Sequence, residues 1–118
     1  MTITYEESSM AHYLIAQVKV NDDSWIPDYA ANVHDIVHRH GGKYLSRSGN
    51  ITTLEGDEST ASLIALIEFP SGDALHAFVA DPEYRPYAEA RIAGTDSQLV
   101  AIDRSDAAGT IPYLIANG

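Results

Sequence analysis

Cysteine is absent from this chain, and basic residues are scarce. Without cysteine there is no disulfide framework, no thiolate nucleophile and no cysteine-ligated metal or iron–sulfur site. Seven lysine and arginine residues stand against seventeen aspartate and glutamate residues, which gives a formal net charge of −10 at pH 7. Such an acidic chain repels phosphate backbones and anionic lipid headgroups. We therefore expect neither nucleic acid nor a membrane as a partner.

Long apolar runs are also lacking. No stretch approaches the length that spans a bilayer, and the first residues, "MTITYEESSM", lack the basic and apolar regions of a signal peptide. We expect a cytoplasmic protein. With 118 residues, of which 45% are hydrophobic, the chain suits one domain with its own core. The expected division is an N-terminal extension over residues 1–10, a folded domain over 11–104 and a tail over 105–118.

Alternating apolar residues predict strands over residues 11–20, 62–69 and 97–103. In the first of these segments the even positions form an unbroken apolar row, made of Leu14, Ala16, Val18 and Val20. Two further strand segments are expected over residues 43–49 and 51–56, separated by a bulge or a tight turn.

Apolar residues at spacings of three and four predict a helix that follows "NDDS" and ends at Gly41. Its apolar stripe consists of Ile26, Tyr29, Ala30, Val33, Val37 and His40. A second helix is expected to begin near Ser71, a favourable N-cap residue. Pro86 cannot lie deep inside a helix, so a turn and a new helix are expected there. That helix presents Tyr87 and Arg91 on one face.

The expected order is strand, helix, strand, strand, helix, strand. This is the order of the ferredoxin-like βαββαβ fold, an α+β architecture whose four-stranded antiparallel sheet carries its helices on one face. The other face is bare and apolar, and it presents Tyr13, Ile15, Ile64 and Leu66. An exposed apolar sheet of this size indicates an interface. We therefore expect a homodimer that packs sheet to sheet into an α+β barrel.

The tetrapeptide "YLIA" occurs twice, at residues 13–16 and 113–116. The flanking residues differ and no other segment repeats, so a duplication is not indicated. Both copies suit a strand. Because Pro112 has no backbone N–H, the second copy is expected at a sheet edge, as an extra strand beside its own sheet or that of a partner. A disordered tail is the alternative.

Several motifs together carry a family resemblance. They are "HYLIAQVKV", "HGGKYLSRSG", "LEG", "LIEFPS" and "ADPEY", in that order. With them, residues 11–103 resemble the domain of unknown function 1330 family, DUF1330, of the dimeric α+β barrel superfamily. The resemblance implies the ferredoxin-like fold and the sheet-to-sheet dimer. It implies no reaction, because related families include cofactor-free monooxygenases, lactone isomerases, haem-dependent peroxidases and ligand-binding modules.

Histidines are the first candidates for chemistry, because imidazole titrates close to neutral pH. In the expected topology the first helix ends near the start of the first strand, which brings His40 towards His12 for acid–base work. Alternatively, His40 fills part of the core and stabilises the helix end. His34 and His38 have a spacing that suits two metal ligands, but no third ligand accompanies them. We expect a solvated helix flank there and no metal site.

Arginines and tyrosines form the second candidate set. At the opposite end of the sheet, the residues expected to converge over a cleft are Tyr29, Arg47, Tyr84, Tyr87 and Arg91. Two guanidinium groups beside phenols would bind an anion or a carboxylate. Alternatively, each arginine pairs with one of the many acidic residues.

Glu68 is the only charged residue in the apolar segment 62–69. It pairs with Lys19 or Arg47, or it is an isolated buried carboxylate, which would make it a candidate for a functional site. Its place near the end of the strand also allows simple exposure. The candidates for a catalytic role are therefore His40, Arg47 and Glu68.

The sequence thus predicts a small homodimeric protein that binds a small organic molecule between sheet and helices, with an anion as one option. Cofactor-independent oxygenase- or isomerase-type chemistry is one option, and no cofactor is expected. The alternative is a non-catalytic ligand-binding or structural dimer module. A haem enzyme is a third hypothesis, for which the chain is short.

Overall fold

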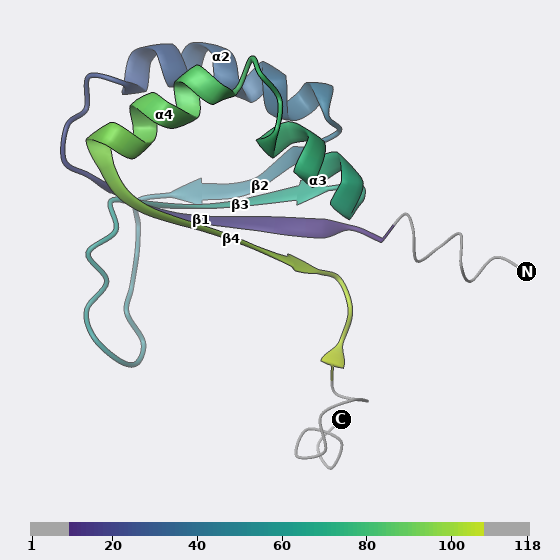
Figure 1. Ribbon diagram of the computed structural model, residues 1–118. Coiled ribbons are helices and arrows are strands. Elements are labelled where there is room, and N and C mark those ends of the chain that lie inside the picture. The colour runs from purple at the N-terminus through teal and green to yellow at the C-terminus, as the bar shows by residue number, and fades with distance from the viewer. Residues whose placement is uncertain (1–9, 108–118) are drawn as a thin grey trace, which may run out of the picture.

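The computed structural model describes residues 10–107. Its elements in chain order are β1 (His12–Val20), α2 (Ile26–Arg39), β2 (Lys43–Ser48), β3 (Leu63–Phe69), α3 (Gly72–Val79), α4 (Arg85–Gly94) and β4 (Thr95–Asp103). The strands form one antiparallel sheet in the order β2-β3-β1-β4. The helices cover one face of this sheet (Figure 1). The predicted ferredoxin-like α+β fold is confirmed, with α3 and α4 together forming the second crossover.

The helix ends follow from local chemistry. Helix α2 ends at Arg39, and it is followed by Gly41, whose φ of 80° is favourable only for glycine and whose N–H donates to the carbonyl of His38 at 2.9 Å. Helix α3 begins after Ser71, whose Oγ accepts a hydrogen bond from the N–H of Ala74 at 3.1 Å. Both ends match the expectations from the sequence.

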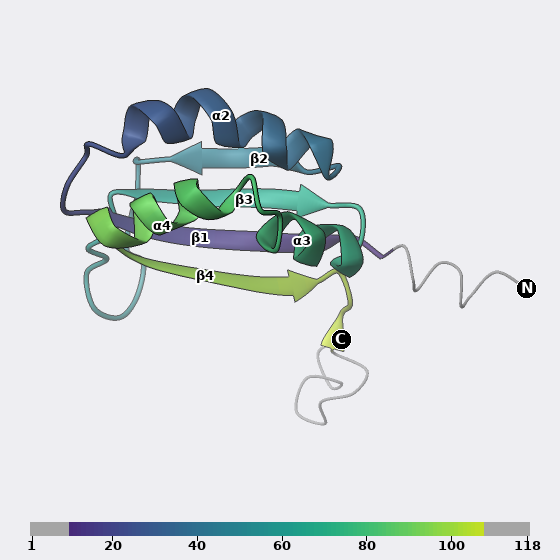
Figure 2. The same cartoon turned by 45° about the horizontal axis from the view of Figure 1, so that its top comes forward.

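The core lies between the sheet and the helices, and Figure 2 shows α3 and α4 in front of the sheet. Its larger part contains Phe69 of β3 and Phe78 of α3, together with Val33 and Val37 of α2, all of them 2% exposed or less. A second, smaller part is made of shorter side chains on the sheet, Ala16, Val18 and Ala65. The difference in side-chain size between these two parts determines where the core is fully packed.

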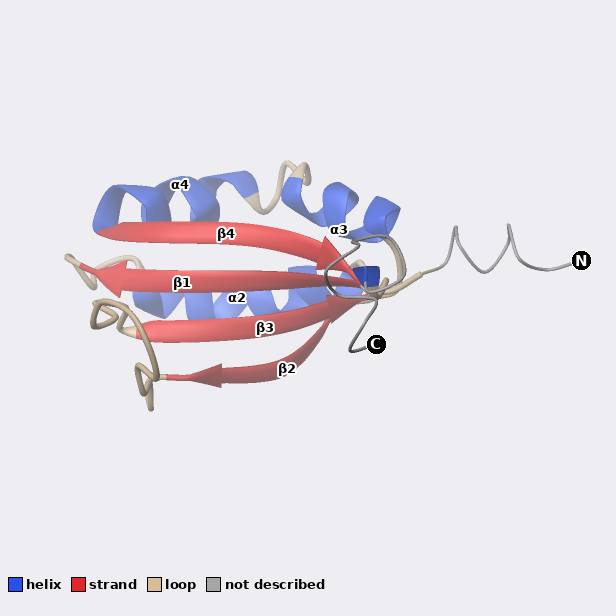
Figure 3. Cartoon of the chain, turned by 90° about the horizontal axis from the view of Figure 1, so that it is seen from below, coloured by secondary structure: helices blue, strands red, loops and turns tan. Residues whose placement is uncertain are grey.

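The opposite face of the sheet has no helix over it (Figure 3). Residues alternate between the two faces, so this face holds the odd positions of β1 and the even positions of β3 and β4. Its apolar side chains are Tyr13, Ile15, Ile64, Leu66, Val100 and Ile102. Val100 is 44% exposed and Ile102 is 57% exposed, so this face offers apolar surface to its surroundings.

One strand prediction is wrong. Residues 51–56 form no strand, and the whole segment 49–62 between β2 and β3 is a loop. Its backbone uses side-chain acceptors in place of a ladder; the N–H of Asn50, for example, donates to Oγ of Ser48 at 2.9 Å. Pairing of β2 with β3 ends at Ser48, opposite Ile64, and β3 begins at Leu63, so a longer β2 would have no part of β3 to pair with.

This loop also has a characteristic position. Figure 1 shows that it extends below the sheet, on the side away from the helices. It carries Leu54, which is 92% exposed. The loop therefore stands beside the apolar face of the sheet.

The predicted tail strand and the N-terminal extension, apart from Met10, lie outside the described residues. Within residues 10–107, no helix is both long enough and apolar enough to cross a membrane.

Candidate functional site

A cavity of about 400 Å³ lies between the sheet and the helices. Its walls include the small side chains of Ala16, Val18 and Ala65 on the sheet and Ala30 on α2. These side chains are too short to fill the space between the two layers, so a gap remains where longer ones would have met. The volume is within the range of about 300–1,000 Å³ that is typical of small-molecule sites.

A second hollow, of about 520 Å³, lies where the loop before β3 approaches β1 and β4. It is wide open to solvent, and most of its lining is polar, with Gln17, Lys19, Thr60, Asp96, Ser97 and Gln98 among the residues. An open polar hollow leaves a ligand hydrated, whereas small-molecule sites are usually enclosed and mostly apolar. The cavity between sheet and helices is therefore the candidate site.

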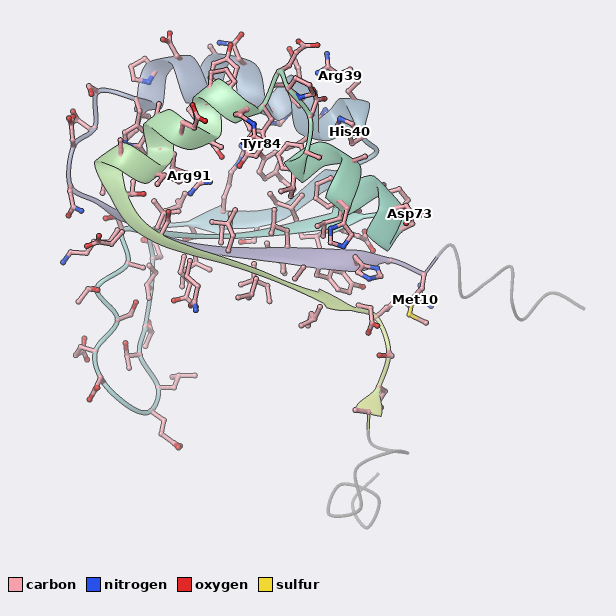
Figure 4. All side chains as sticks on the ribbon, viewed as in Figure 1. Met10, Arg39, His40, Asp73, Tyr84 and Arg91 are labelled. Carbon is pink, nitrogen blue, oxygen red and sulfur yellow. The ribbon has the colours of Figure 1, made fainter. Side chains whose placement is uncertain are left out.

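The buried end of the cavity is formed by Arg91 of α4, which is 6% exposed, and by Tyr84, which is 4% exposed. Nη1 of Arg91 donates to Oγ of Ser97 at 2.7 Å, and Nη2 donates to the phenol oxygen of Tyr84 at 3.4 Å. That phenol oxygen lies 3.5 Å from the phenol oxygen of Tyr29 on α2. Figure 4 shows Arg91 below α4, in the layer between helix and sheet. The buried guanidinium of Arg91 thus connects α4 directly with β4 and, through the Tyr84 hydroxyl, with Tyr29 of α2.

In the described part of the chain, this buried cation has no acidic partner. Arg91 takes part in none of the ion pairs within residues 10–107, and its Nε has no hydrogen-bond partner. Burial acts to lower the pKa of Arg91, but the phenols of Tyr84 and Tyr29 outweigh it and raise the pKa above its usual range. Burial, aided by Tyr84, also raises the pKa of Tyr29. At neutral pH the guanidinium is therefore charged and the Tyr29 phenol is protonated.

Trp25, just before α2, also lines the cavity. Its ring meets that of Tyr29 edge to face, with centroids 5.1 Å apart. It also lies so close to Gly94 that an added Cβ there would be 2.6 Å from Cδ1 of the indole. The indole Nε1 is buried and has no hydrogen-bond partner. Sequence reasoning missed this residue, although it is the only tryptophan in the chain and directly precedes a helix.

At its other end the cavity opens between α2 and β2, where Arg47 is exposed. The guanidinium of Arg47 lies 3.9 Å from the centroid of the Tyr44 ring, and its Nη2 donates to Nδ1 of His34 at 3.2 Å. The ring of His34 stacks on Tyr44 with centroids 5.2 Å apart. Burial raises the pKa of Tyr44, whose phenol therefore stays protonated at neutral pH. Arg47 is thus positioned by ring contacts and a histidine.

The structure brings together four of the six predicted ligand-binding residues around this cavity, namely Tyr29, Arg47, Tyr84 and Arg91. Tyr87 packs against the larger part of the core without lining the cavity. His12 lies elsewhere, with its ring near Gly72 and its Nδ1 3.2 Å from the carbonyl oxygen of Met10.

Of the predicted catalytic residues, only Arg47 lines the cavity. His40 lies at the end of α2 (Figure 4). Its Nε2 is 2.7 Å from a carboxylate oxygen of Asp81. Glu68 lies on the helix-free side of the sheet, in register with Lys43 and Tyr13. These two residues therefore occupy positions away from the cavity.

A family model allows this geometry to be placed among known proteins. The model of a domain of unknown function, DUF1330, matches residues 11–105. The chain belongs to the DUF1330 family. The match spans every strand and helix of the described fold, from β1 to β4. The search of curated proteins found no match.

Solved structures share the fold of this DUF1330 chain. A protein of unknown function from Rhodopseudomonas palustris is 20% identical, with 89% of this chain and 90% of that chain covered and a TM-score of 0.69. SnoaB, a cofactor-independent oxygenase from Streptomyces nogalater, is 16% identical, with coverages of 82% and 95% and a TM-score of 0.58. A dimeric ferredoxin-like protein of unknown function from Thermobifida fusca is 15% identical, with coverages of 80% and 92% and a TM-score of 0.51. At these identities the similarity shows the fold alone.

Proposed function

We propose that this DUF1330 protein binds a small organic anion in the cavity between its sheet and its helices, with Arg91 as the counter-ion. The observation that carries the proposal is a buried guanidinium that has no carboxylate partner within residues 10–107. Burying a charge is costly unless that charge is paired. A negatively charged ligand would provide the missing partner.

The remainder of the cavity suits an apolar or aromatic body. Its walls combine aliphatic side chains with the rings of Trp25, Tyr29, Tyr44, Phe78 and Tyr84. Ligand sites of this kind use many apolar contacts for affinity and a few polar groups for orientation. A ring or short chain that bears one carboxylate or enolate would place its apolar part against these walls and its negative charge at the polar group.

Cofactor-independent oxygenase- or isomerase-type chemistry is the catalytic version of the proposal. Such reactions proceed through anions, and a preorganised guanidinium stabilises negative charge as it develops. SnoaB, which shares the fold, is a cofactor-independent oxygenase. Arg91 would stabilise the anion in this role.

A non-catalytic ligand-binding module is the second candidate function. The cavity lining contains neither a histidine nor a carboxylate that could accept a proton. Mass spectrometry and NMR of a bound organic acid, before and after incubation in air-saturated buffer, separate the two. A changed mass, or a changed NMR spectrum of the acid at unchanged mass, supports catalysis, whereas an acid that is unchanged in both supports the module.

The binding proposal is tested with phenylacetate as the anionic probe and 2-phenylethanol as its neutral counterpart. We expect phenylacetate to bind and Arg91→Met to weaken it roughly tenfold or more, because a hydrogen bond to a charged group is worth about 1.5–3 kcal/mol. Binding is followed by the fluorescence of Trp25, the only tryptophan. Arg47→Met, at the exposed mouth, is the matched control and should have a smaller effect. Equal affinity for acid and alcohol would refute the proposal.

We also propose that two copies pair through the helix-free face of the sheet. The supporting observations are the apolar side chains on that face and the dimeric state of the ferredoxin-like protein from Thermobifida fusca. Covering apolar surface contributes about 25 cal/mol per Å². A second copy would present the same apolar face and would cover this one.

Sedimentation of Ile15→Lys tests the pairing. A charge in the centre of an apolar interface is costly, so we expect this variant to sediment as a monomer at concentrations where the wild type is a dimer. Val79→Lys is the control, because Val79 is 47% exposed on α3, away from the sheet face. A wild-type protein that sediments as a monomer at micromolar concentration would contradict the pairing.

A further inference from the structure

Among residues 10–107, two buried side-chain N–H donors lack a partner, and both belong to side chains that line the candidate cavity. They are Nε1 of Trp25 and Nε of Arg91. Buried polar groups in proteins are nearly always hydrogen-bonded, so each exception calls for an explanation. Two exceptions in the wall of one cavity indicate a shared explanation.

The two donors lie at the same end of the cavity. The indole of Trp25 packs against Gly94, where an added Cβ would be 2.9 Å from Nε1. Arg91 precedes Gly94 by three residues on α4, and residues three apart lie on one face of a helix, about 5–6 Å from each other. The residue that carries one donor and the residue that contacts the other are therefore one helical turn apart on α4.

Tyr29 links the two side chains. Its ring meets the Trp25 ring at a centroid distance of 5.1 Å, and its hydroxyl lies 3.5 Å from that of Tyr84. The Tyr84 hydroxyl in turn accepts from Nη2 of Arg91. This chain of contacts connects the Trp25 ring to the guanidinium through two tyrosines.

We propose that the ligand carries two oxygen acceptors on neighbouring carbons, a negatively charged one for Nε of Arg91 and a carbonyl oxygen for Nε1 of Trp25. The ligand class is thus an aryl or alicyclic 2-oxo acid, or the corresponding enolate. This rests on the proposed function, because it places the organic anion in the same cavity, and it adds the second oxygen. A carboxylate whose oxygens both face the guanidinium of Arg91 would leave the indole N–H unpartnered.

The proposal is tested with phenylglyoxylate and phenylacetate. Both have a phenyl ring and a carboxylate joined by one carbon, and they differ in that this carbon is a carbonyl in the first and a methylene in the second. We expect the wild type to prefer phenylglyoxylate roughly three- to tenfold, as one added neutral hydrogen bond allows. Isothermal titration calorimetry measures both affinities without relying on tryptophan fluorescence.

Trp25→Phe keeps an aromatic ring and removes the N–H. We expect it to abolish the preference for phenylglyoxylate, so that the two ligands bind equally. Because both ligands meet the same enlarged space, the ratio of affinities is insensitive to the lost ring area. Tyr44→Phe is the matched control: it removes a hydroxyl from another part of the cavity wall and should leave the ratio unchanged.

The outcomes separate this inference from the proposed function. If Trp25→Phe keeps the preference while Arg91→Met weakens both ligands, the indole contact is refuted and the anion site stands. The same holds if the wild type has no preference, which would mean that water alone satisfies the indole N–H. If Arg91→Met leaves both affinities unchanged, or if neither ligand binds the wild type at millimolar concentration, the anion site and the inference both fail.

Discussion

Two groups of charged side chains connect the helices of this protein, and they are satisfied in opposite ways. At the end of α2, Arg39 pairs with Asp81 at 3.4 Å and with Glu83 at 3.2 Å, while His40 lies 2.7 Å from Asp81. In the interior, Arg91 connects α4 to neighbouring phenols and a serine and has no carboxylate within the described residues. The half-exposed Arg39 is paired with carboxylates, and the buried Arg91 is not paired with any carboxylate of residues 10–107.

This difference is informative because carboxylates are abundant in the chain. With seventeen acidic residues, a partner for the buried arginine would be readily available in the sequence. A surface pair contributes little to stability, whereas an unpaired buried charge is costly. Sites that carry such a cost are usually those in which the group has a task other than holding the fold together.

The largest expected effect comes from removing the buried charge. Arg91→Met should raise the free energy of unfolding of the ligand-free protein by about 1–4 kcal/mol, because methionine fills similar space without an uncompensated charge. Ser97 keeps a contact with Oγ1 of Thr95 at 3.0 Å, and Tyr84 keeps its contact with Tyr29, so little else is lost. Urea denaturation measures the change.

The matched control is Arg47→Met, which changes an exposed arginine at the mouth of the same cavity. It should alter the free energy of unfolding by no more than about 0.5 kcal/mol. A destabilised Arg91→Met would show that the guanidinium holds the fold together, and the contrast between the two groups of charges would disappear.

A smaller effect is expected at the paired surface cation. The Arg39 side chain is 50% exposed, so Arg39→Met should lower the free energy of unfolding by only about 0.2–1 kcal/mol. Because salt screens exposed charges, this loss should shrink further at high ionic strength. Urea denaturation at low and high salt tests both statements, and a loss that is large and independent of salt would contradict them.

The smallest effect concerns acid stability. The pKa of Asp81 is lowered, chiefly by the hydrogen bond with His40 and then by the N–H of Glu83 and the charge of Arg39. A carboxylate whose pKa is lower in the folded state contributes stability above the unfolded value of about 3.9. That contribution is lost as the pH falls through the folded pKa.

Asp81→Asn removes this titration. Between about pH 5 and pH 3 the wild type should therefore lose more stability than the variant. Thermal unfolding of both proteins across this range provides the measurement. Parallel curves would show that the carboxylate is no better stabilised in the folded protein than in the unfolded chain.

Much of the fold was predictable because it depends on local patterns. Alternation of apolar residues located β1, β3 and most of β4, Gly41 located the end of α2, and Pro86 located the start of α4. The segment 51–56 was mistaken for a strand because its β-branched residues suit one, and propensity does not show whether a pairing edge is available. That information depends on where β3 begins.

The candidate site was only partly predictable. The arginines and tyrosines of α2, β2 and α4 could be grouped, because the expected topology places these elements on one side of the sheet. The cavity itself depends on small size differences among side chains of several elements, such as Ala16 and Ala65, and no single segment reveals their sum. Trp25 was missed because it directly precedes α2 and therefore lies outside the apolar stripe of that helix.

The loop between β2 and β3 has a consequence for any body that approaches the open side of the sheet. Because the loop projects below the sheet at one end of the strands (Figure 1), a broad, flat partner molecule would contact the loop before it reached the sheet. Binding to the strands therefore depends on the shape of a partner as well as on its apolar surface. A partner must either end before it reaches the loop or accommodate the loop in a groove of its own. Shortening the loop would allow a wider range of partner molecules to bind this face without a change to any residue of the sheet.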